Sequence, residues 1–261
     1  MRKIGINFMC KSGFERQEYI DKIKAMGIDA TFTGVYNEED SFDIANKLSA
    51  AGIEWETMHA SFAYINDMWR DASHSWEAYK NLTDAVDRCA SVGVKKTVIH
   101  MTSGLTPPPV SDLGCARYEK LVNYAISKGV TLAFENIRKI SHMAWAFEKF
   151  ADVPEVGFCW DVGHEGCYYP PCTQFMNMFE DKLICTHIHD NDKVYNRDDH
   201  YLPFDGKIDF DRVAKQLKNF DGILMLEVSG NIERYAEMDK DEYLEKAVGT
   251  IKRLREMVEA E

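Results

Sequence analysis

Residues 183 to 210 combine histidines and aspartates with a short apolar run, a mixture suited to metal binding or proton transfer. The run from Leu183 to Ile188 predicts a buried strand. Because side chains alternate along a strand, His187 and His189 at its end are expected to point the same way. We interpret His187 as a candidate metal ligand or general base. For either histidine taken alone, a place in a polar loop is the alternative.

Three further apolar runs end in an acidic residue: TLAFE at Glu135, VGFCWD at Asp161 and ILMLE at Glu227. If these ends meet that of His187, carboxylates and an imidazole share a small volume. Without a cation the carboxylates would repel one another, and some would take up a proton. A divalent metal bound by oxygen and nitrogen donors resolves the conflict, and Mn²⁺, Co²⁺, Mg²⁺ and Zn²⁺ all accept such donors. Separate surface carboxylates are the alternative. The pattern favours one divalent metal ion without selecting which.

The elements that must position these residues alternate between strand and helix along the whole chain. The predicted strands are Lys3 to Phe8, Ile28 to Thr33, Ile53 to His59, Lys95 to His100, Val130 to Glu135, Glu155 to Asp161, Leu183 to His189 and Ile223 to Val228. The predicted helices are Glu15 to Met26, Glu39 to Ala51, Ser73 to Ser91, Asp112 to Ser127, Ser141 to Phe150, Thr173 to Glu180, Asp209 to Asn219 and Asp241 to Val258. This alternation predicts an α/β protein with a single (β/α)8 TIM barrel domain over residues 1–261.

In such a barrel the carboxyl ends of the strands meet at one mouth. Glu135, Asp161, His187 and Glu227 would then face one another from the last four strands. An open doubly wound sheet is the alternative fold. That fold usually carries a glycine-rich phosphate loop after its first strand, whereas this chain has MCKSGFER there.

Other polar residues are predicted to ring the same mouth. His59 and His100 end the third and fourth strands, and His164 lies three residues beyond Asp161. Asp198 and His200 lie in the loop after the seventh strand. Each could be a hydrogen-bonded structural residue when taken singly. Their shared location makes them candidates for binding a ligand.

The charge balance disfavours some partners. The chain has 31 basic and 43 acidic side chains and a formal net charge of −12. Such a chain repels phosphate backbones and anionic membrane surfaces on average. We therefore expect neither a nucleic acid nor a membrane as the partner, and a homo-oligomer is possible.

The cysteines and the start of the chain suggest a compartment. Seven cysteines are an odd number and form no CxxC pair, which fits reduced thiols. The start MRKIGINFMCK reaches a charge at Lys11 before any export-length apolar region, and no run of 18 apolar residues occurs. We expect a soluble, cytoplasmic protein.

Several segments together resemble the xylose isomerase-like TIM barrel superfamily. They are FEN at 134–136, WDVGH at 160–164, HIHDND at 187–192, DDHYLPFDGKIDF at 198–210 and LEV at 226–228. The resemblance covers nearly the whole chain and is specific to the superfamily but not to one substrate. This superfamily includes sugar isomerases, epimerases and dehydratases, as well as AP endonuclease barrels.

The resemblance implies roles for individual residues. By similarity to keto-sugar epimerases and hydroxypyruvate isomerases, Glu135, Asp161, His187 and Glu227 hold one metal ion, and the two glutamates form the acid/base pair. By the same similarity His164 would bind a substrate oxygen. From their location we also assign substrate binding to His59, His100, Lys193, Asp198 and His200. The epimerases have an arginine where this chain has Lys193, so the contacts of that loop are open.

The implied function is a metal-dependent isomerase or epimerase acting on a keto-sugar or sugar phosphate. A metal that chelates a carbonyl and its neighbouring hydroxyl acidifies the C–H between them and stabilises an enediolate. A carboxylate on each side can remove and return the proton. The partner is thus a small sugar or polyol, and aromatic residues near the mouth could wall its pocket: Phe8, Phe62, Trp69 and Trp160.

Other functions use the same residues. A keto-inositol dehydratase, which is a lyase, could expel a β-hydroxyl after the same enolisation. A trinuclear-zinc AP endonuclease would use His59, His100, His164, Asp198 and His200 as further ligands, although the acidic charge and lack of a basic groove disfavour it. A barrel that only binds sugar would be expected to lack one of the two glutamates, and both are present.

Overall fold

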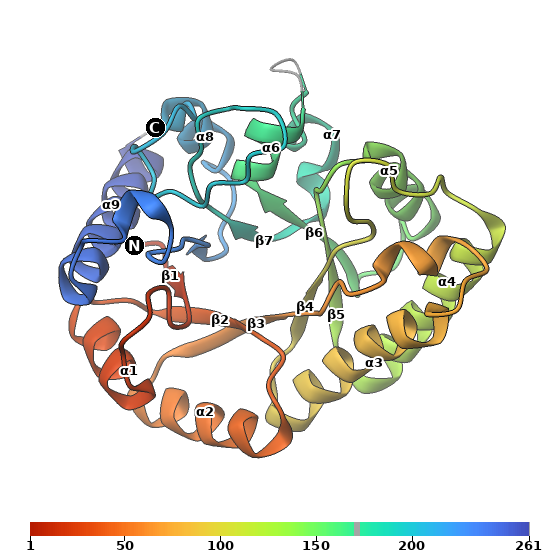
Figure 1. Ribbon diagram of the computed structural model, residues 1–261, viewed down its shortest axis with the longest axis horizontal. Coiled ribbons are helices and arrows are strands. Elements are labelled where there is room, and N and C mark those ends of the chain that lie inside the picture. The colour runs from red at the N-terminus through yellow and green to blue at the C-terminus, as the bar shows by residue number, and fades with distance from the viewer. Residues whose placement is uncertain (170–172, 261) are drawn as a thin grey trace.

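The computed structural model, which describes residues 1–169 and 173–260, is a single barrel of parallel strands inside a ring of helices (Figure 1). The strands are β1 (Ile4–Asn7), β2 (Ala30–Gly34), β3 (Glu54–His59), β4 (Lys96–Ile99), β5 (Thr131–Glu135), β6 (Val156–Asp161), β7 (Leu183–His187) and β8 (Leu224–Leu226). Their order is β7-β6-β5-β4-β3-β2-β1-β8. The predicted (β/α)8 barrel is therefore confirmed.

The ring closes between β7 and β8 through a single residue beyond the end of β7. Ile188 forms a parallel bridge with Leu226. Its N–H donates to the Met225 carbonyl at 2.8 Å, and its own carbonyl accepts from Glu227 N at 3.0 Å. This closure brings Glu227 beside the end of β7, because its backbone is bonded directly to that strand.

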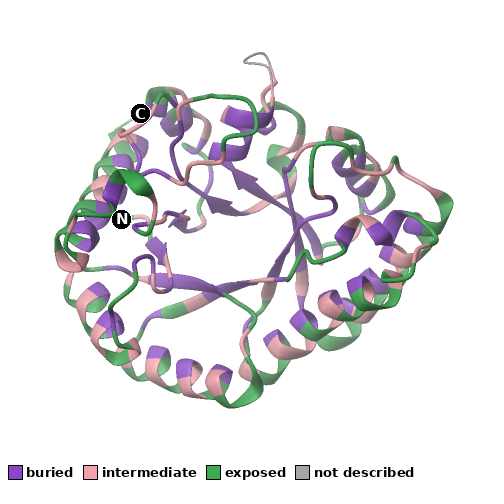
Figure 2. Cartoon of the chain, viewed as in Figure 1, coloured by how far each residue is buried: buried purple, intermediate pink, exposed green. Residues whose placement is uncertain are grey.

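The helices surround the strands and turn their apolar faces inward (Figure 2). They are α1 (Arg16–Ala25), α2 (Glu38–Ala51), α3 (Ser75–Val92), α4 (Asp112–Lys128), α5 (Ile140–Lys149), α6 (Val162–Tyr168), α7 (Met176–Phe179), α8 (Phe210–Gln216) and α9 (Lys240–Ala260), with short 3-10 turns η1 (Ile65–Trp69), η2 (Glu180–Lys182) and η3 (Glu233–Tyr235). Local chemistry sets several ends: the Asn37 side chain accepts from Asp40 N at the start of α2, and Gly52 ends α2 at φ 65°.

Side chains fill the inside of the barrel. Val98, Ala133, Cys159 and Cys185 form one buried cluster there. A Cβ on Gly157 would lie 2.5 Å from the Ile184 Cδ1, so β6 needs a glycine where Ile184 occupies the interior. The barrel is thus a packed core rather than a channel.

Most elements lie within a few residues of the sequence-based expectations, but three regions near the mouth differ more. The strand β7 ends at His187 rather than His189, and beyond it Ile188 forms a further parallel bridge, with Leu226 of β8. The helix α6 was not predicted, although the Asp161 side chain caps it by accepting from His164 N. The helix expected at Thr173 to Glu180 is limited to α7, and residues 170–172 before it lie outside the described part.

The described cysteines are all unpaired: Cys10, Cys89, Cys115, Cys159, Cys167 and Cys185. Cys172 lies outside the described residues. Within 1–169 and 173–260, none of the helices combines the length and the apolar character needed to span a membrane.

Candidate active site

The four predicted metal ligands converge at the mouth. Glu135, Asp161 and His187 end β5, β6 and β7, and Glu227 directly follows β8. One donor atom from each lies within 4.8 Å of the others. His187 Nδ1 is 2.9 Å from Glu135 Oε1 and 3.1 Å from Glu227 Oε2. Carboxylate oxygens and an imidazole nitrogen in this arrangement suit a divalent cation.

Asp161 is oriented so that one oxygen stays free. Asn136 accepts from the Asp161 N–H at 2.7 Å and donates to its carbonyl at 2.8 Å, which fixes the backbone. The Asp161 Oδ1 accepts from His164 N at 2.5 Å. Its Oδ2 is buried without a hydrogen-bond partner. A bound cation would satisfy this orphaned oxygen, so the residues present fit a metal ion.

Ionisation at the site reflects a balance between burial and charge. Burial raises the pKa of Asp161. Burial also opposes the charge on Glu135, but the imidazoles of His187 and His100 outweigh it and hold the pKa of Glu135 well below its usual range. Burial favours neutral His187, yet Glu227 and Glu135 raise the pKa of His187 well above its usual value. In the cation-free protein, protons on imidazoles therefore supply the positive charge that the carboxylates require.

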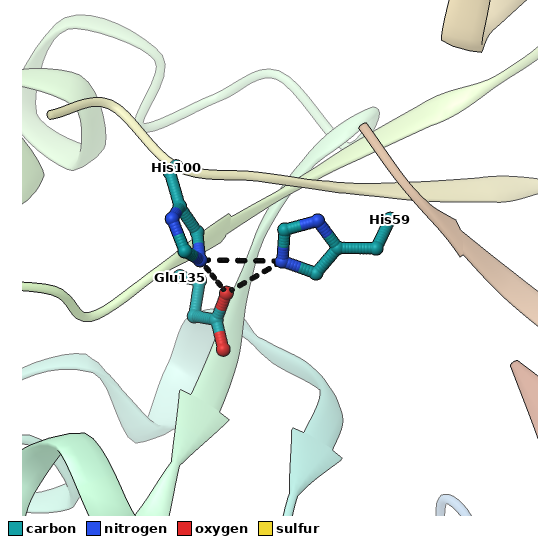
Figure 3. Close-up of side chains that lie close together, drawn as sticks. All are labelled: His59, His100 and Glu135. Atoms are coloured by element: carbon teal, nitrogen blue, oxygen red, sulfur yellow. Dashed lines mark hydrogen bonds and ion pairs between the residues drawn. The ribbon is translucent and has the colours of Figure 1, made fainter. Parts of the chain in front are cut away.

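On one flank of this group, two histidines converge on a ligand carboxylate (Figure 3). His59 and His100 approach from the ends of β3 and β4, and their Nε2 atoms lie 3.2 Å and 2.6 Å from Glu135 Oε2. The two Nε2 atoms are 3.2 Å apart. Burial lowers the pKa of His100 to about 4, although Glu135 opposes this.

On the other flank, Asp198 receives two histidines. His164 Nε2 lies 3.0 Å from Asp198 Oδ2, and His200 Nε2 lies 3.4 Å from the same oxygen. Burial disfavours the charged form of both rings, but nearby carboxylates outweigh burial. Asp161 and Asp198 raise the pKa of His164 to about 10. Asp198 is the main cause that raises the pKa of His200 to about 10. Asp198 comes from the loop after β7, so this flank depends on that loop as well as on the barrel.

Backbone carbonyls fix the orientation of three of these rings. Nδ1 of His59 lies 2.9 Å from the Ala60 carbonyl, and the Nδ1 atoms of His164 and His200 lie 3.0 Å from the carbonyls of Asn136 and Glu227. A ring that donates through Nδ1 presents Nε2 toward the carboxylates. Metal-binding and substrate-binding histidines are commonly oriented this way.

Above the four candidate ligands lies a pocket of about 490 Å³. Its described lining comprises Phe32, Gly34, Val35, His59, Ala60, Ser61, Phe62, His100, His164, Asp198, His200 and Glu227. The pocket therefore includes all the predicted substrate-binding residues except Lys193. Lys193 is exposed, and its backbone N–H donates to Asn191 Oδ1 at 2.9 Å.

Among the aromatic residues considered for the pocket wall, only Phe62 lines it. Its ring stacks on His100 with 4.7 Å between centroids. Phe8, Trp69 and Trp160 are instead buried in the hydrophobic core. Aromatic type alone does not separate wall from core, because both positions favour large apolar rings.

Two neighbours of the site were not assigned a role from the sequence. Phe32 on β2 stacks on His187 at 4.5 Å, and no local pattern marks it. His189 is fully buried, with Nε2 3.2 Å from Asp161 Oδ1. Its spacing from His187 was the available signal, since both were expected to point the same way.

The fold has several solved counterparts at low sequence identity. A D-tagatose 3-epimerase-like protein superposes with a TM-score of 0.76 at 19% identity, covering 99% of this chain and 98% of the other. D-psicose 3-epimerase from Clostridium cellulolyticum H10 gives 0.75 at 14% identity, covering 99% and 100%. The 3-keto-D-glucoside 4-epimerase YcjR from E. coli gives 0.73 at 17% identity, covering 98% and 100%.

Sequence comparison gives the family. The uncharacterized protein y4fM of Sinorhizobium fredii (strain NBRC 101917 / NGR234) is 28% identical over 203 residues, covering 71% of this chain and 63% of that protein. The chain thus spans less than two thirds of the length of this curated relative. The profile of the xylose isomerase-like TIM barrel matches residues 20–254. The chain therefore belongs to the xylose isomerase-like TIM barrel family.

Proposed function

We propose that this protein is a divalent-metal-dependent isomerase or epimerase of keto-sugars. The observation that carries the proposal is the placement of Glu135 and Glu227 on one imidazole nitrogen, at 2.9 Å and 3.1 Å, beneath an open pocket. Two carboxylates at one cation-binding position can hold the cation and exchange a substrate proton. The epimerases among the structural counterparts agree with this chemistry.

The cation, when bound, would polarise a substrate carbonyl and stabilise the charge of an enediolate. Glu135, Asp161, His187 and Glu227 would hold it. Glu227 lines the pocket, so its carboxylate is placed to accept a proton from a sugar carbon. Burial opposes its charge, but His187 outweighs burial and lowers the pKa of Glu227 well below its usual range. It would therefore be ionised at neutral pH, which is the state in which a carboxylate can accept a proton.

Glu135 is the second proton carrier of the proposal. It is 1% exposed, beneath His59 and His100. Those imidazoles would bind substrate hydroxyls above it, as would His164 on the other flank. The two carboxylates would thus act in different surroundings, one lining the pocket and one beneath its histidines. Such an asymmetry allows one group to remove the proton while the other returns it.

The pocket lining favours a neutral sugar over a sugar phosphate. None of the described residues that line it is a lysine or an arginine. Asp198 and Glu227 add negative charge to its wall. A phosphate dianion would therefore face these two carboxylates with only the imidazoles of the described lining to offset them, whereas sugar hydroxyls can bond to carboxylates and imidazoles alike.

A trinuclear-zinc nuclease is a second candidate, because the two flanks also resemble metal sites. His59, His100 and Glu135 form one compact group of donors, and His164 and His200 share the Asp198 oxygen. Together with the four predicted metal ligands, these two flanks supply enough donor atoms to bind more than one cation. The net charge of −12 argues against a DNA substrate.

Metal content and product analysis together test the proposal. The purified protein would be analysed for bound metal, and one tightly held divalent cation per chain is expected. It would then be incubated with Mn²⁺ or Co²⁺ in heavy water with ketoses, keto-inositols and hydroxypyruvate. An isomeric sugar that carries deuterium beside the carbonyl is expected.

The same experiment identifies the alternatives. Loss of water from a keto-inositol would indicate the dehydratase reaction. Three zinc ions per chain, together with nicking of abasic-site DNA and no sugar turnover, would establish the nuclease instead. Exchange can be slow in a closed site, so products must be measured as well as deuterium.

A further inference from the structure

The residues after His187 make contacts that the proposed chemistry does not use. Asp190 is fully buried, and its carboxylate accepts from three backbone N–H groups. Oδ1 accepts from Asn191 N at 2.8 Å and Ile208 N at 2.9 Å, and Oδ2 accepts from Gly206 N at 2.7 Å. The backbones of Asp190 and Tyr201 also exchange two hydrogen bonds of 2.9 Å. Asp190 thus joins the end of β7 to the distant return of its own loop.

That loop carries part of the candidate site. Asp198 and His200 lie between the two segments that Asp190 joins, and the outer residues 193–197 of the loop are exposed. No barrel strand holds Asp198. His200 has anchors at the mouth, because its Nδ1 meets the Glu227 carbonyl and its own carbonyl accepts from Ser229 N at 3.1 Å. Besides its contacts with His164 and His200, the position of Asp198 therefore depends on how the loop is fixed at its base.

Asn191 extends the same connection to the helix that carries His164. Its Nδ2 donates to the Gly163 carbonyl at 2.7 Å, next to His164 in α6. Its own carbonyl accepts from Lys207 N at 2.8 Å. Asp190 and Asn191 thus link the segment that carries His164 with the loop that carries Asp198.

The packing around this link is tight. A Cβ on Gly206 would lie 2.5 Å from the Asn191 carbonyl oxygen and 2.5 Å from Asp190 Oδ1. No side chain fits there without moving the backbone or the carboxylate. The link can therefore be disturbed from either side, at Asp190 or at Gly206.

We propose that Asp190 is a positioning residue that holds the loop after β7 so that Asp198 and His200 face the pocket. It acts on the substrate-facing wall and not on the central ligands, because Glu135, Asp161, His187 and Glu227 are held by the strands or directly beside them. The proposal rests on the proposed function for its substrate, but not for its structural consequence.

The first test compares Asp190→Asn with Asp29→Asn. Asparagine keeps the shape of the side chain, but its NH2 group replaces one of the two carboxylate oxygens. The backbone N–H that donated to that oxygen then has no acceptor. Asp29 is a control for the loss of a carboxylate–backbone hydrogen bond elsewhere, since its Oδ2 accepts from Ile4 N at 3.0 Å at the other end of the barrel. We expect amide hydrogen exchange over residues 192–208 to rise about tenfold or more in Asp190→Asn only.

Metal and substrate binding give the other readouts. Affinity for Mn²⁺, measured by titration calorimetry, should change by less than about twofold in both variants. With the sugar that the wild-type protein turns over, KM should rise about tenfold in Asp190→Asn and kcat should fall less. A purely structural role would lower global stability without this separation of KM from Mn²⁺ affinity.

Gly206→Ala provides a second variant in case Asp190→Asn folds poorly. It should give the same faster exchange, the same unchanged Mn²⁺ affinity and the same rise in KM. Wild-type exchange in this loop in both variants, or loss of Mn²⁺ affinity in step with KM, would overturn the proposal. The exchange and Mn²⁺ measurements need no substrate, so they test Asp190 even if no sugar reacts and the proposed function fails.

Discussion

Buried carboxylates are neutralised differently at the two ends of the barrel interior. At the amino-terminal end of the strands, Lys96 Nζ lies 2.8 Å from Glu56 Oε1, so one ammonium neutralises one buried carboxylate. At the mouth, Glu135, Asp161 and Glu227 gather around His187 with no lysine or arginine among the described residues that line the pocket. At the amino-terminal end a lysine neutralises the carboxylate, whereas at the mouth the negative charge of the carboxylates requires protons on imidazoles or a bound cation. Incomplete internal balance thus distinguishes the end where we propose that metal and substrate bind.

Buried histidines show the same difference. His142 lies against Trp69, away from any carboxylate that would raise its pKa, and burial lowers the pKa of His142 to about 4. Burial acts in the same direction on His164, but Asp161 and Asp198 raise its pKa to about 10. The environment, and not burial alone, therefore decides whether a buried imidazole carries a proton.

The largest expected effect separates the carboxylates of the two ends. Glu135→Gln and Glu227→Gln should each lower kcat about a thousandfold or more, roughly 4 kcal/mol, because each removes a proton carrier and a charged ligand. Glu56→Gln should leave kcat within about twofold, since Glu56 contacts no residue of the mouth that takes part in proton transfer. Steady-state kinetics with Mn²⁺ and circular dichroism on folded variants would measure this. A near-normal rate in either mouth variant would refute the acid/base assignment.

The next effect concerns stability at the balanced end. Lys96→Met leaves the Glu56 carboxyl buried without its partner, and the free energy of unfolding should fall by about 3 to 5 kcal/mol. Lys3→Met is the matched control, because Lys3 also pairs with a glutamate at 2.8 Å but both side chains are largely exposed. Its cost should stay below about 1 kcal/mol. Urea unfolding of both variants compares them, and equal losses would show that burial does not matter here.

The third effect is pH dependence. The folded pKa of His142, about 4, lies below the unfolded value near 6.5, so its neutral form stabilises the protein above pH 6.5. That contribution, up to about 3 kcal/mol, should be lost as the pH falls from 6.5 toward 4. His164 has the opposite effect in the cation-free protein, because its pKa is raised to about 10. Its protonated form stabilises the folded protein at low pH, and that stabilisation is lost as the pH rises toward 10.

Urea unfolding of the wild type and His142→Leu at pH 7 and pH 4.5 would measure the His142 contribution. The stability difference between the two proteins should shift in favour of the variant at the lower pH. An unchanged difference would mean that His142 titrates alike in the folded and unfolded states.

The smallest effect distinguishes a substrate-binding histidine from a ligand. His164→Ala should raise KM about tenfold, roughly 1.4 kcal/mol, while the central cation is retained. Metal analysis accompanies the kinetics, and His74→Ala provides a control at an exposed histidine stacked on Tyr64. Loss of the cation in His164→Ala would instead make His164 a ligand.

Much of the fold follows from the sequence because its signals are local. Apolar runs such as VGFCWD and the helical spacing between them repeat along the chain, and parallel strands with this alternation close into a barrel. The fold then brings Glu135, Asp161, His187 and Glu227 together, since each ends or directly follows a strand. Their roles stay predictions, as does that of Lys193, which the structure places outside the pocket lining.

Contacts between distant residues could not be predicted in this way. The carboxylate of Asp190 meets the backbone of Gly206 and Ile208, and no periodic pattern relates positions in a long loop to a strand end. Phe32 faces His187 only because β2 and β7 lie across the closed barrel.

The sequence by itself determined the strands, the helices and the donor types at the strand ends, because these depend on the period of neighbouring residues. The tertiary structure decided which oxygen of Asp161 stays free, which nitrogen of His164 faces Asp198 and which imidazoles carry protons. These properties depend on burial and on charges brought within a few ångströms of one another, and both arise only when the barrel closes.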